Sequence, residues 1–397
     1  MADTNTNPGA SALRIALVCP FSLSRPGGVQ GQVLGLARCL RAEGHEATVF
    51  APVDDEFEPP AGVEVVATGH SVSLPANGSV APVTVSPLAV RRALRAIRSS
   101  NFDVVHVHEP FAPGVPYGLL LGRRLPPLVV TFHRSGGSPF YAALGPLTRR
   151  LSRRFMVRCA VSDAARSTAF AAVGGRYEVG FNGIEVSQYQ DVSGWPTDRP
   201  TILFLGRHEE RKGLRVLLEA FDLMGGVRDD GDPAPLGAPV LWIAGDGPET
   251  ADLRRRYPES DSIRWLGILS EEEKIRRLVG ADVVAAPSIG GESFGIVLLE
   301  AMAARTTVVA SDIDGYRAAS GGRAVLATVD DPEAWAKALT GVLDGSLGVV
   351  HPPDDGPLAG RDGWLDGARG WAEHWSMGEL ARWYVPIYRR AMVRAAG

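Results

Sequence analysis

The stretch Ser288-Ile-Gly-Gly-Glu-Ser-Phe-Gly-Ile-Val-Leu-Leu-Glu-Ala-Met-Ala303 follows the apolar run 282–285 and decides how the second half of the chain folds. A strand, a glycine-rich turn and an apolar helix in this order make one unit of a parallel α/β sheet. Glu292 stands at the mouth of the predicted helix, and Glu300 follows a little over two turns later, toward the same side. Because a buried acid on an apolar helix needs a partner, packing alone does not explain Glu300.

Similar units extend outward from this stretch. In the second half, strand-like runs stand at 201–205, 240–244, 263–266, 282–285 and 307–310. In the first half they stand at 14–19, 47–51, 63–66, 103–107, 128–131 and 157–161. Such runs, apolar on both faces and separated by helical segments, predict an α/β fold with mainly parallel sheets.

The domain organisation follows from the length and from a turn-rich segment. A chain of 397 residues exceeds the size of one ordinary core, and the segment 191–200, with one Gly and two Pro, separates the two series of strands. The predicted parts are a disordered leader at 1–12, domains at 13–192 and 193–376, and an amphipathic C-terminal helix at 377–397. Loops are expected at 225–239 and 344–370, which are rich in Gly, Pro and Asp.

The composition excludes several classes of protein. With 45% hydrophobic and 22% charged residues the chain is an ordinary globular protein, and its net charge of -4 argues against a general nucleic-acid binder. Three scattered cysteines form no disulfide framework, which suits a reducing cytoplasm. The polar N-terminus is not typical of a signal peptide, and prolines with an arginine pair interrupt the apolar segment 111–130, so we expect no membrane span.

A basic loop follows the run 201–205. Arg207 and Lys212 stand just past the carboxyl end of a predicted parallel strand, which is where open α/β sheets bind ligands. Arginine can clamp phosphate oxygens with two bonds, and lysine adds a point charge. The alternative is a solvated loop in which Glu209 and Glu210 neutralise the cations.

A glycine pair, Gly27-Gly28, follows the first predicted strand and opens a helix. Glycines at a helix start let the backbone approach an anion such as a pyrophosphate, although a plain tight turn uses the same residues. The pair is not the G-x-G-x-x-G fingerprint, and neither half of the chain carries one with a downstream acid. A nicotinamide oxidoreductase is therefore not favoured.

Histidines mark two strand ends in the first half. His106, His108 and Glu109 suggest a metal site, but two alternate histidines on a strand without a third ligand favour a packing role. His133 follows the run 128–131. A lone histidine there is normally structural, but its place at the end of a predicted strand, where α/β sheets bind ligands, makes a site role the alternative.

The predicted helix 87–98 is basic on one side. Its arginines suit the anionic heads of lipids, while a solvated arginine face above an apolar contact through Leu88, Leu94 and Ile97 is the alternative. The residues expected to contact the membrane are Arg91, Arg92, Arg95 and Arg98.

Taken together, the Glu292 to Glu300 pattern, the loop 206–213 and the Gly27-Gly28 turn resemble the retaining glycosyltransferases of family 4. That resemblance implies the GT-B fold, in which two Rossmann-like domains face across a cleft and the C-terminal helix crosses back to the first domain. Within the family, the chain is most similar to the bacterial phosphatidyl-myo-inositol mannosyltransferases, which use GDP-mannose. The runs that carry this likeness are 18–22, 26–30, 77–80, 102–104, 106–110, 131–133, 160–163 and 290–297.

The resemblance implies a role for each site residue. The first domain would bind the acceptor and the second the nucleotide-sugar donor. The implied pyrophosphate ligands are the Gly28 amide, Arg207 and Lys212, with Glu300 on the ribose, Glu292 on the sugar hydroxyls, His133 beside the transferred sugar and Ile268 at the nucleobase. Further donor contacts are expected from Ser293, Phe294, Gly295 and Ile296, and acceptor contacts from Gln30, Asn77 and Ser79.

The same resemblance implies a displacement on one face of the sugar without a protein nucleophile, a cofactor or a catalytic metal. Positive charge would stabilise the departing diphosphate. The expected function is transfer of mannose from GDP-mannose to a phosphatidyl-inositol-type lipid, by a cytoplasmic protein peripheral on the inner membrane face.

The likeness departs from the family in the acceptor region. Ala76 stands where the family has an aromatic residue, Pro82 where it has a basic one, and Arg134 begins a segment where it has a hydroxyl-rich loop. A second hypothesis is therefore a family 4 enzyme with another nucleotide sugar, or with a soluble sugar or cyclitol as acceptor. A third, from another class, is a non-catalytic nucleotide-binding regulator.

Overall fold

The computed structural model describes residues 11–25, 27–54, 57–76, 79–134, 145–226, 237–290, 292, 294–347 and 360–396. It divides into two compact units: the chain up to Gly183 together with the segment from Met377, and the segment Ile184–Ser376. The predicted leader lies almost wholly outside the described residues. The first unit ends before the predicted boundary at 192, because Val186 and Tyr189 of the short helix η2 (Val186–Tyr189) are buried in the core of the second unit.

In the described part of the first unit, seven parallel strands form one sheet in the order β3-β2-β1-β6-β7-β8-β9. They are β1 (Arg14–Val18), β2 (Glu46–Ala51), β3 (Glu64–Ala67), β6 (Val104–His108), β7 (Leu128–Phe132), β8 (Phe155–Ala160) and β9 (Glu178–Val179). Every residue of β6 and β7 is buried, as runs that are apolar on both faces predict. The sequence did not predict β9 or the antiparallel hairpin of β4 (Val72–Ala76) and β5 (Ser79–Val83), which are short and, in the hairpin, contain prolines.

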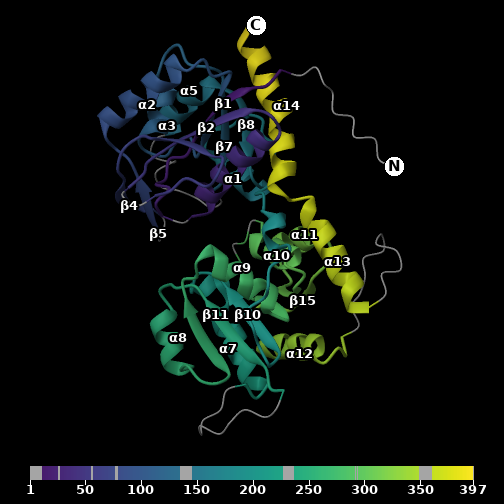
Figure 1. The fold of residues 1–397 in the computed structure, drawn as a ribbon. Coiled ribbons are helices and arrows are strands. Elements are labelled where there is room, and N and C mark those ends of the chain that lie inside the picture. Colours follow the sequence, from purple (N-terminus) through teal and green to yellow (C-terminus); the bar gives the residue numbers. More distant parts are fainter. Residues whose placement is uncertain are drawn as a thin grey trace, which may run out of the picture. The chain divides into compact units, whose positions relative to one another are not determined.

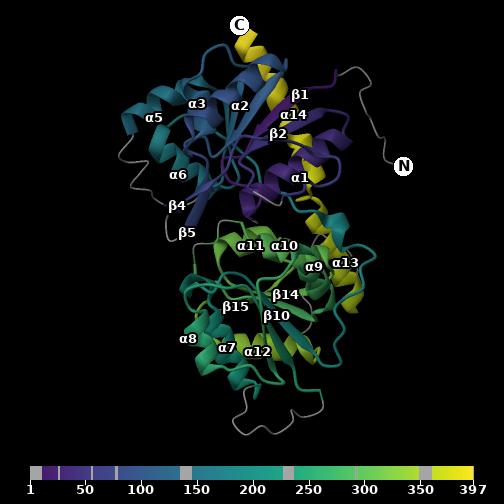
Figure 2. The same cartoon turned by 60° about the vertical axis from the view of Figure 1, so that its left-hand side comes forward.

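Helices cover both faces of this sheet (Figures 1 and 2). One face carries α1 (Gly28–Ala42) and α14 (Met377–Ala396). The other carries α2 (Pro87–Ser99), α3 (Val115–Leu121), α5 (Gly145–Leu151) and α6 (Asp163–Val173), with the short helix η1 (Ser152–Arg154) after α5. The C-terminal helix is thus an integral layer of the first unit.

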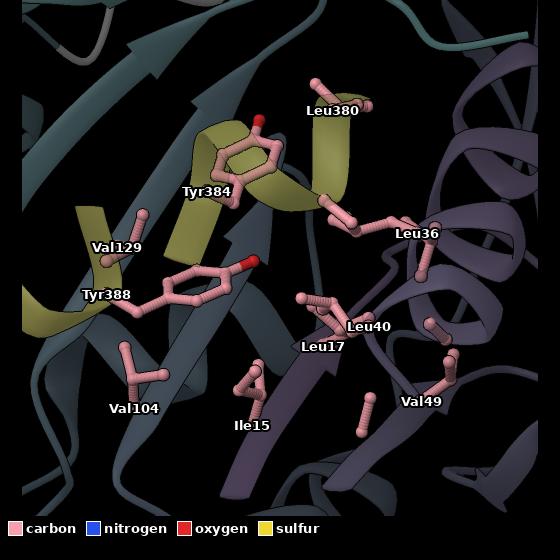
Figure 3. Close-up of a cluster of buried hydrophobic side chains, with 14 of the residues drawn as sticks. Ile15, Leu17, Leu36, Leu40, Val49, Val104, Val129, Leu380, Tyr384 and Tyr388 are labelled. Carbon is pink, nitrogen blue, oxygen red and sulfur yellow. The ribbon is translucent and has the colours of Figure 1, made fainter. Parts of the chain in front are cut away.

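Aromatic residues of α14 are part of the core of the first unit. Figure 3 shows Leu380, Tyr384 and Tyr388 of α14 among aliphatic side chains of α1, β1, β6 and β7. Their hydroxyls are hydrogen bonded to the sheet: Tyr388 Oη lies 2.9 Å from His106 Nδ1, and Tyr384 Oη lies 2.8 Å from Thr131 Oγ1. These bonds satisfy polar groups that burial would otherwise leave unpaired.

In the described part of the second unit, six parallel strands form a sheet in the order β12-β11-β10-β13-β14-β15. They are β10 (Thr201–Leu205), β11 (Val240–Ala244), β12 (Ile263–Gly267), β13 (Val283–Ala286), β14 (Thr307–Ser311) and β15 (Val325–Ala327). One face packs against α9 (Glu271–Gly280), α10 (Ile296–Ala303), α11 (Asp314–Ser320) and α13 (Gly360–Glu373). The other packs against α7 (Leu214–Leu223), α8 (Thr250–Arg256) and α12 (Pro332–Leu343), while the short helix η3 (Glu210–Lys212) precedes α7.

The expectation of a loop over 344–370 was wrong for its last part. From Gly360 the chain forms α13, whose Trp364, Leu365 and Ala368 are buried. These residues stand at helical spacing, but neighbouring glycines, which weaken helices, hide the pattern. Residues 348–359 lie outside the described part, as does most of the expected loop 225–239.

Helices of the described residues all lack either the length or the hydropathy that a span of the bilayer requires.

We expect Tyr388→Ala to lower the free energy of unfolding of the first unit by about 3 kcal/mol or more. The substitution removes a fully buried ring and leaves His106 Nδ1 without its partner, the Tyr388 hydroxyl. Val393→Ala is the matched control on the same helix, since Val393 is 74% exposed, and it should change stability by less than about 0.5 kcal/mol. The stability of both variants is measured by urea unfolding, with hydrogen exchange of β6 and β7 as the probe. Equal stability of the two variants would show that α14 does not support the sheet.

Candidate active site

The loop after β10 carries three cations, two of which bind one carboxylate of the same loop. Glu209 accepts a bond from Arg207 Nε through Oε1 and from Arg211 Nε through Oε2, each at 2.9 Å. Glu209 is 22% exposed, whereas both arginine side chains are nearly half exposed. Lys212, the third cation, ends η3 on the same loop.

Glu292 joins this loop to the turn before α10. Its Oε1 lies 2.5 Å from Lys212 Nζ and 2.9 Å from Arg211 Nη1. The Lys212 and Glu292 side chains are only 20% and 13% exposed, so this ion pair is mostly shielded from water. The loop is therefore not simply a solvated charge run, because its cations bind a partly buried acid from a distant segment. The sequence did not assign Arg211 a role.

A cavity of about 550 Å³ lies beside this cluster, at the carboxyl ends of β10, β11 and β12. It is lined by Leu205, Gly206, Arg207, Gly245, Asp246, Gly247, Ile268, Leu269 and Lys274. Ile268 is 79% exposed, which is unusual for a large apolar side chain and suits a surface that a flat ring could cover. Gly245 has φ +121°, and a Cβ there would stand 1.8 Å from the Gly206 carbonyl oxygen, so only glycine lets the two loops meet.

Glu300 has the partner that its apolar helix required. Lys274 of α9 donates to Glu300 Oε1 at 2.9 Å and pairs with Glu271 at 2.8 Å. Burial disfavours the charged form of Lys274, but the two carboxylates outweigh burial and raise its pKa above the usual value. Since Lys274 also lines the cavity, it connects Glu300 to that cavity. No pattern in the sequence marked Lys274 as the partner of Glu300.

The turn before α10 is fixed mainly by packing. The helix begins at Ile296, later than the sequence suggested, after Gly295 in the left-handed region with φ +75°. Phe294 packs edge-on against Trp375, with ring centroids 5.1 Å apart. Donor contacts from Phe294, Gly295 and Ile296 stay a prediction. Ser293 lies outside the described residues.

Gly28 begins α1 of the first unit and is exposed. A Cβ at this position would meet nothing within 4 Å, so no internal contact requires the glycine. Open space at the start of a 15-residue helix leaves its amides room for an anion. Gln30, in contrast, is buried, and its Nε2 donates to the carbonyl oxygens of Ser22 and Arg25 at 3.2 and 3.1 Å. Its side-chain amide holds the loop before α1, and its acceptor role stays a prediction.

His133 is held from two sides. Its Nε2 lies 2.8 Å from His108 Nδ1, while its backbone N–H and that of Arg134 donate to Glu109 Oε1 at 2.6 and 2.9 Å. Glu109 itself has φ +47°, a left-handed conformation that costs a residue with a side chain on the order of 1 kcal/mol or more. Such strain at a strand end is typical of a functional site.

His106 has hydrogen-bond partners at both nitrogens. Its Nδ1 meets Tyr388 Oη, and its Nε2 lies 2.7 Å from Thr131 Oγ1. These contacts agree with a packing role. Within the described residues, no three His, Cys, Asp or Glu side chains gather as a metal site would require.

Burial keeps these histidines uncharged at neutral pH. It lowers the pKa of His106 to about 3, with a smaller effect of His133, and that of His133 to about 4, with an opposing hydrogen-bond effect of Asn182. The pKa of His108 is likewise lowered by burial and by its two neighbours. His133 can therefore act as a neutral donor or acceptor of hydrogen bonds.

The remaining acceptor candidates lie on or near the β4–β5 hairpin. Asn77 lies outside the described residues, and Ser79 begins β5 opposite Ala76. Pro82 offers its carbonyl oxygen to the Ser22 amide at 2.8 Å, which ties the hairpin to the loop before α1.

On α2 the four predicted arginines are all exposed, and the apolar contact is made by Ala89, Ala93 and Ile97. Leu88, expected on the buried side, is 55% exposed instead. It stands in the first turn of the helix, beyond the layer that packs on α3 and the sheet.

Comparisons with known proteins were made for the whole chain. Residues 26–188 match the family described as Glycosyltransferase Family 4, and residues 199–345 match the one described as Glycosyl transferases group 1. The phosphatidyl-myo-inositol mannosyltransferase of Mycolicibacterium smegmatis is 39% identical over 340 residues, which cover 84% of this chain and 85% of that protein. The D-inositol 3-phosphate glycosyltransferase of Xylanimonas cellulosilytica is 28% identical, over 98% of this chain and 99% of that protein.

Solved structures share the fold. Anabaena HepE, in complex with UDP and glucose, superposes with a TM-score of 0.66 at 18% identity and covers 95% of this chain and 99% of its own. A glycosyltransferase from Rickettsia africae gives a TM-score of 0.68 at 16% identity, over 96% and 99% of the two chains.

Two Rossmann-like units, with a cation and carboxylate cluster at the strand ends of the second, define this chain as a glycosyltransferase with the GT-B fold. More particularly, it belongs to glycosyltransferase family 4.

We expect Glu292→Gln, Arg207→Ala and Lys212→Ala each to lower the rate of sugar transfer roughly 100-fold or more, because each removes a charge that the family resemblance implies would act on the donor. Melting temperatures should change by only a few degrees, since these side chains lie at the edge of the core. Steady-state kinetics with the functional donor measure the effect. Glu210→Gln, which alters an exposed acid in the same loop, is the control and should stay close to the unmodified rate. Normal rates in all three variants would remove the cluster from the active site.

Proposed function

We propose that this enzyme transfers an α-mannosyl residue from GDP-mannose to a phosphatidyl-myo-inositol-type lipid, with retention of configuration, as a peripheral protein on the cytoplasmic face of the membrane. The observation that carries the proposal is the shielded Lys212–Glu292 pair, which Arg211 also contacts, together with Arg207, which shares Glu209 with Arg211. The 39% identity to a phosphatidyl-myo-inositol mannosyltransferase supports the choice of sugar and acceptor.

The donor would lie along the strand ends of the second unit. The cavity beside Ile268 has room for the nucleoside, and Glu300, held by Lys274, can accept bonds from ribose hydroxyls. Arg207 and Lys212 would bind the diphosphate and stabilise its growing charge as the glycosidic bond breaks. Glu292 would accept bonds from the sugar hydroxyls. These cations supply the charge that a divalent metal supplies in other transferases, so we expect chelators to leave the rate unchanged.

The acceptor side of the proposal rests on the surface of the first unit. The four arginines of α2 lie close to further exposed arginines, since Arg98 Nε donates to the Arg123 carbonyl oxygen at 3.1 Å. Arg154 Nη1 donates to the Leu120 carbonyl oxygen at 2.9 Å, which brings η1 to the end of α3. The exposed arginines of α2, of the turn after α3, and of α5 and η1 are Arg91, Arg92, Arg95, Arg98, Arg123, Arg124, Arg149, Arg150 and Arg153.

This surface suits an anionic bilayer. The stretches 79–102 and 110–134 and the stretch 145–162 contain no Asp or Glu, so nothing in their sequence neutralises the arginines. Leu88 and Leu121 are 55% and 65% exposed and can enter the headgroup layer. Each arginine near anionic lipid contributes on the order of 1 kcal/mol to binding.

A soluble cyclitol acceptor is the second candidate. It is favoured by the D-inositol 3-phosphate glycosyltransferase that aligns with 98% of this chain, and by the family departures at Ala76, Pro82 and Arg134. That relative is only 28% identical to this chain, so we rank a soluble acceptor below the lipid acceptor.

The transfer assay separates these candidates. Purified protein should form an α-mannolipid from GDP-mannose and vesicles containing phosphatidylinositol, with or without EDTA, and should be inactive with UDP-glucose. Product analysis by NMR reports the anomer. Transfer to free inositol or inositol phosphate, but not to lipid, would establish the second candidate. Formation of a β-anomer would disprove retention.

We expect neutralising Arg91, Arg92, Arg95 and Arg98 to glutamine to weaken binding to phosphatidylinositol vesicles at least tenfold, because four favourable charge contacts are lost. Binding of the unmodified protein should also fall with salt. Vesicle flotation measures both effects. The control replaces Arg254, Arg255 and Arg256 of α8, which pair with Asp252 and Glu259. If both sets of variants float alike, α2 is not the membrane surface.

A further inference from the structure

The contact between His108 and His133 constrains which ring nitrogen of each histidine carries the proton. His108 is 2% exposed, and its Nδ1 lies 2.8 Å from His133 Nε2. Within the described residues, the other nitrogen of His108, Nε2, is buried and makes no hydrogen bond. The His106 ring packs beside it, with centroids 4.2 Å apart, and offers it no polar partner.

Two neutral imidazoles can share this hydrogen bond in two ways. If His133 donated through Nε2–H, then His108 would carry its own proton on Nε2, as a buried N–H without an acceptor. If His108 donates through Nδ1–H, its Nε2 is only a bare lone pair. In backbone groups, a buried N–H without an acceptor is rarer than an acceptor with an unused lone pair, and the same cost applied to this ring makes the second arrangement the more stable.

We propose that His108 fixes the tautomer of His133 by donating Nδ1–H to His133 Nε2, so that His133 presents Nδ1–H as a donor toward the transferred sugar. The inference rests on the proposed function and on the place beside that sugar which the family resemblance implies for His133. The substrate group that would meet Nδ1–H is a hydroxyl or another oxygen acceptor, and it would compete there with the Asn182 side chain, which also acts on the His133 ring as a hydrogen-bond partner. His108 is thus a positioning residue, which acts through His133 and not on the substrate.

Glu109 completes the same device. Its carboxylate accepts hydrogen bonds from the backbone N–H groups of His133 and Arg134, while His108, the preceding residue, bonds the imidazole ring of His133. One dipeptide at the end of β6 therefore sets both the place of His133 and the direction of its hydrogen bond. The positive φ of Glu109 is the conformational cost of this arrangement.

Histidine tautomers are measured directly by long-range proton–nitrogen NMR of the full chain labelled at its 8 histidines, each assigned by a single substitution. We expect His133 to carry its proton on Nδ1 and to have a bare Nε2. In His108→Leu, which removes the donor, His133 should become a mixture of both tautomers. His108→Asn keeps an N–H at the position of Nδ1 and should restore the original pattern.

The kinetic counterpart is a fall in kcat without loss of donor binding. His108→Leu should lower kcat roughly five- to tenfold, because only part of the His133 population keeps the competent tautomer, while the donor KM stays within about twofold. His108→Asn should recover most of the rate. His106→Gln is the matched control, since it removes another buried imidazole of β6 that makes no hydrogen bond to His133; it should lower the melting temperature but keep kcat.

A proton on Nε2 of His133 in the unmodified chain would overturn the proposal, and so would an unchanged His133 spectrum in His108→Leu. A His108→Leu variant with altered tautomers and normal kcat would refute the positioning role. The NMR measurement needs no substrate. A chain that transfers no mannose would therefore count against the proposed function and leave the tautomer test intact.

Discussion

The parallel arrangement of the strands is the constraint on which the candidate site residues of each unit depend. In a parallel sheet all carboxyl ends reach the same edge, so residues far apart in sequence meet there. In the first unit this edge holds Glu109 after β6 and His133 after β7. In the second unit it holds Arg207 after β10 and Gly245 after β11, whose loops touch because Gly245 has no side chain. The chemistry thus follows from the topology and needs only short loops.

Opposite charges then fix the groups that this edge brings together. Glu209 engages Arg207 and Arg211 through Nε, so it holds each guanidinium from the side. Lys274 does the same for Glu300. Ion pairs of this kind add little to stability at a surface, but they set the geometry of charged groups before a substrate arrives. Glu292 neutralises Lys212, and a donor that bound Lys212 through phosphate would free that carboxylate for hydroxyl groups.

Much of this could be predicted from sequence, because burial leaves a strong pattern. The runs that became β10 and β11 were predicted with their final bounds, since both strands are covered on two faces and contain almost only apolar residues. The need of Glu300 for a partner also followed from its apolar helix. Which residue is that partner could not be predicted, because Lys274 comes from another helix. Only the packing of α9 beside α10 brings Lys274 and Glu300 together. Helix α13 was missed because its glycines obscured buried Trp364 and Ala368.

The histidines show where residue type alone is ambiguous. His106 and His108 alternate on β6 with His133 nearby, a pattern that sequence can assign to a metal or to packing. Their partners decide between these, since His106 is saturated by Thr131 and Tyr388. Because Tyr388 belongs to α14, the helix that completes the core also supplies one of the two hydrogen-bond partners of His106. The other partner, Thr131, also bonds Tyr384 of the same helix. The C-terminal helix therefore closes the apolar core and satisfies the polar groups of β6 and β7 that it buries.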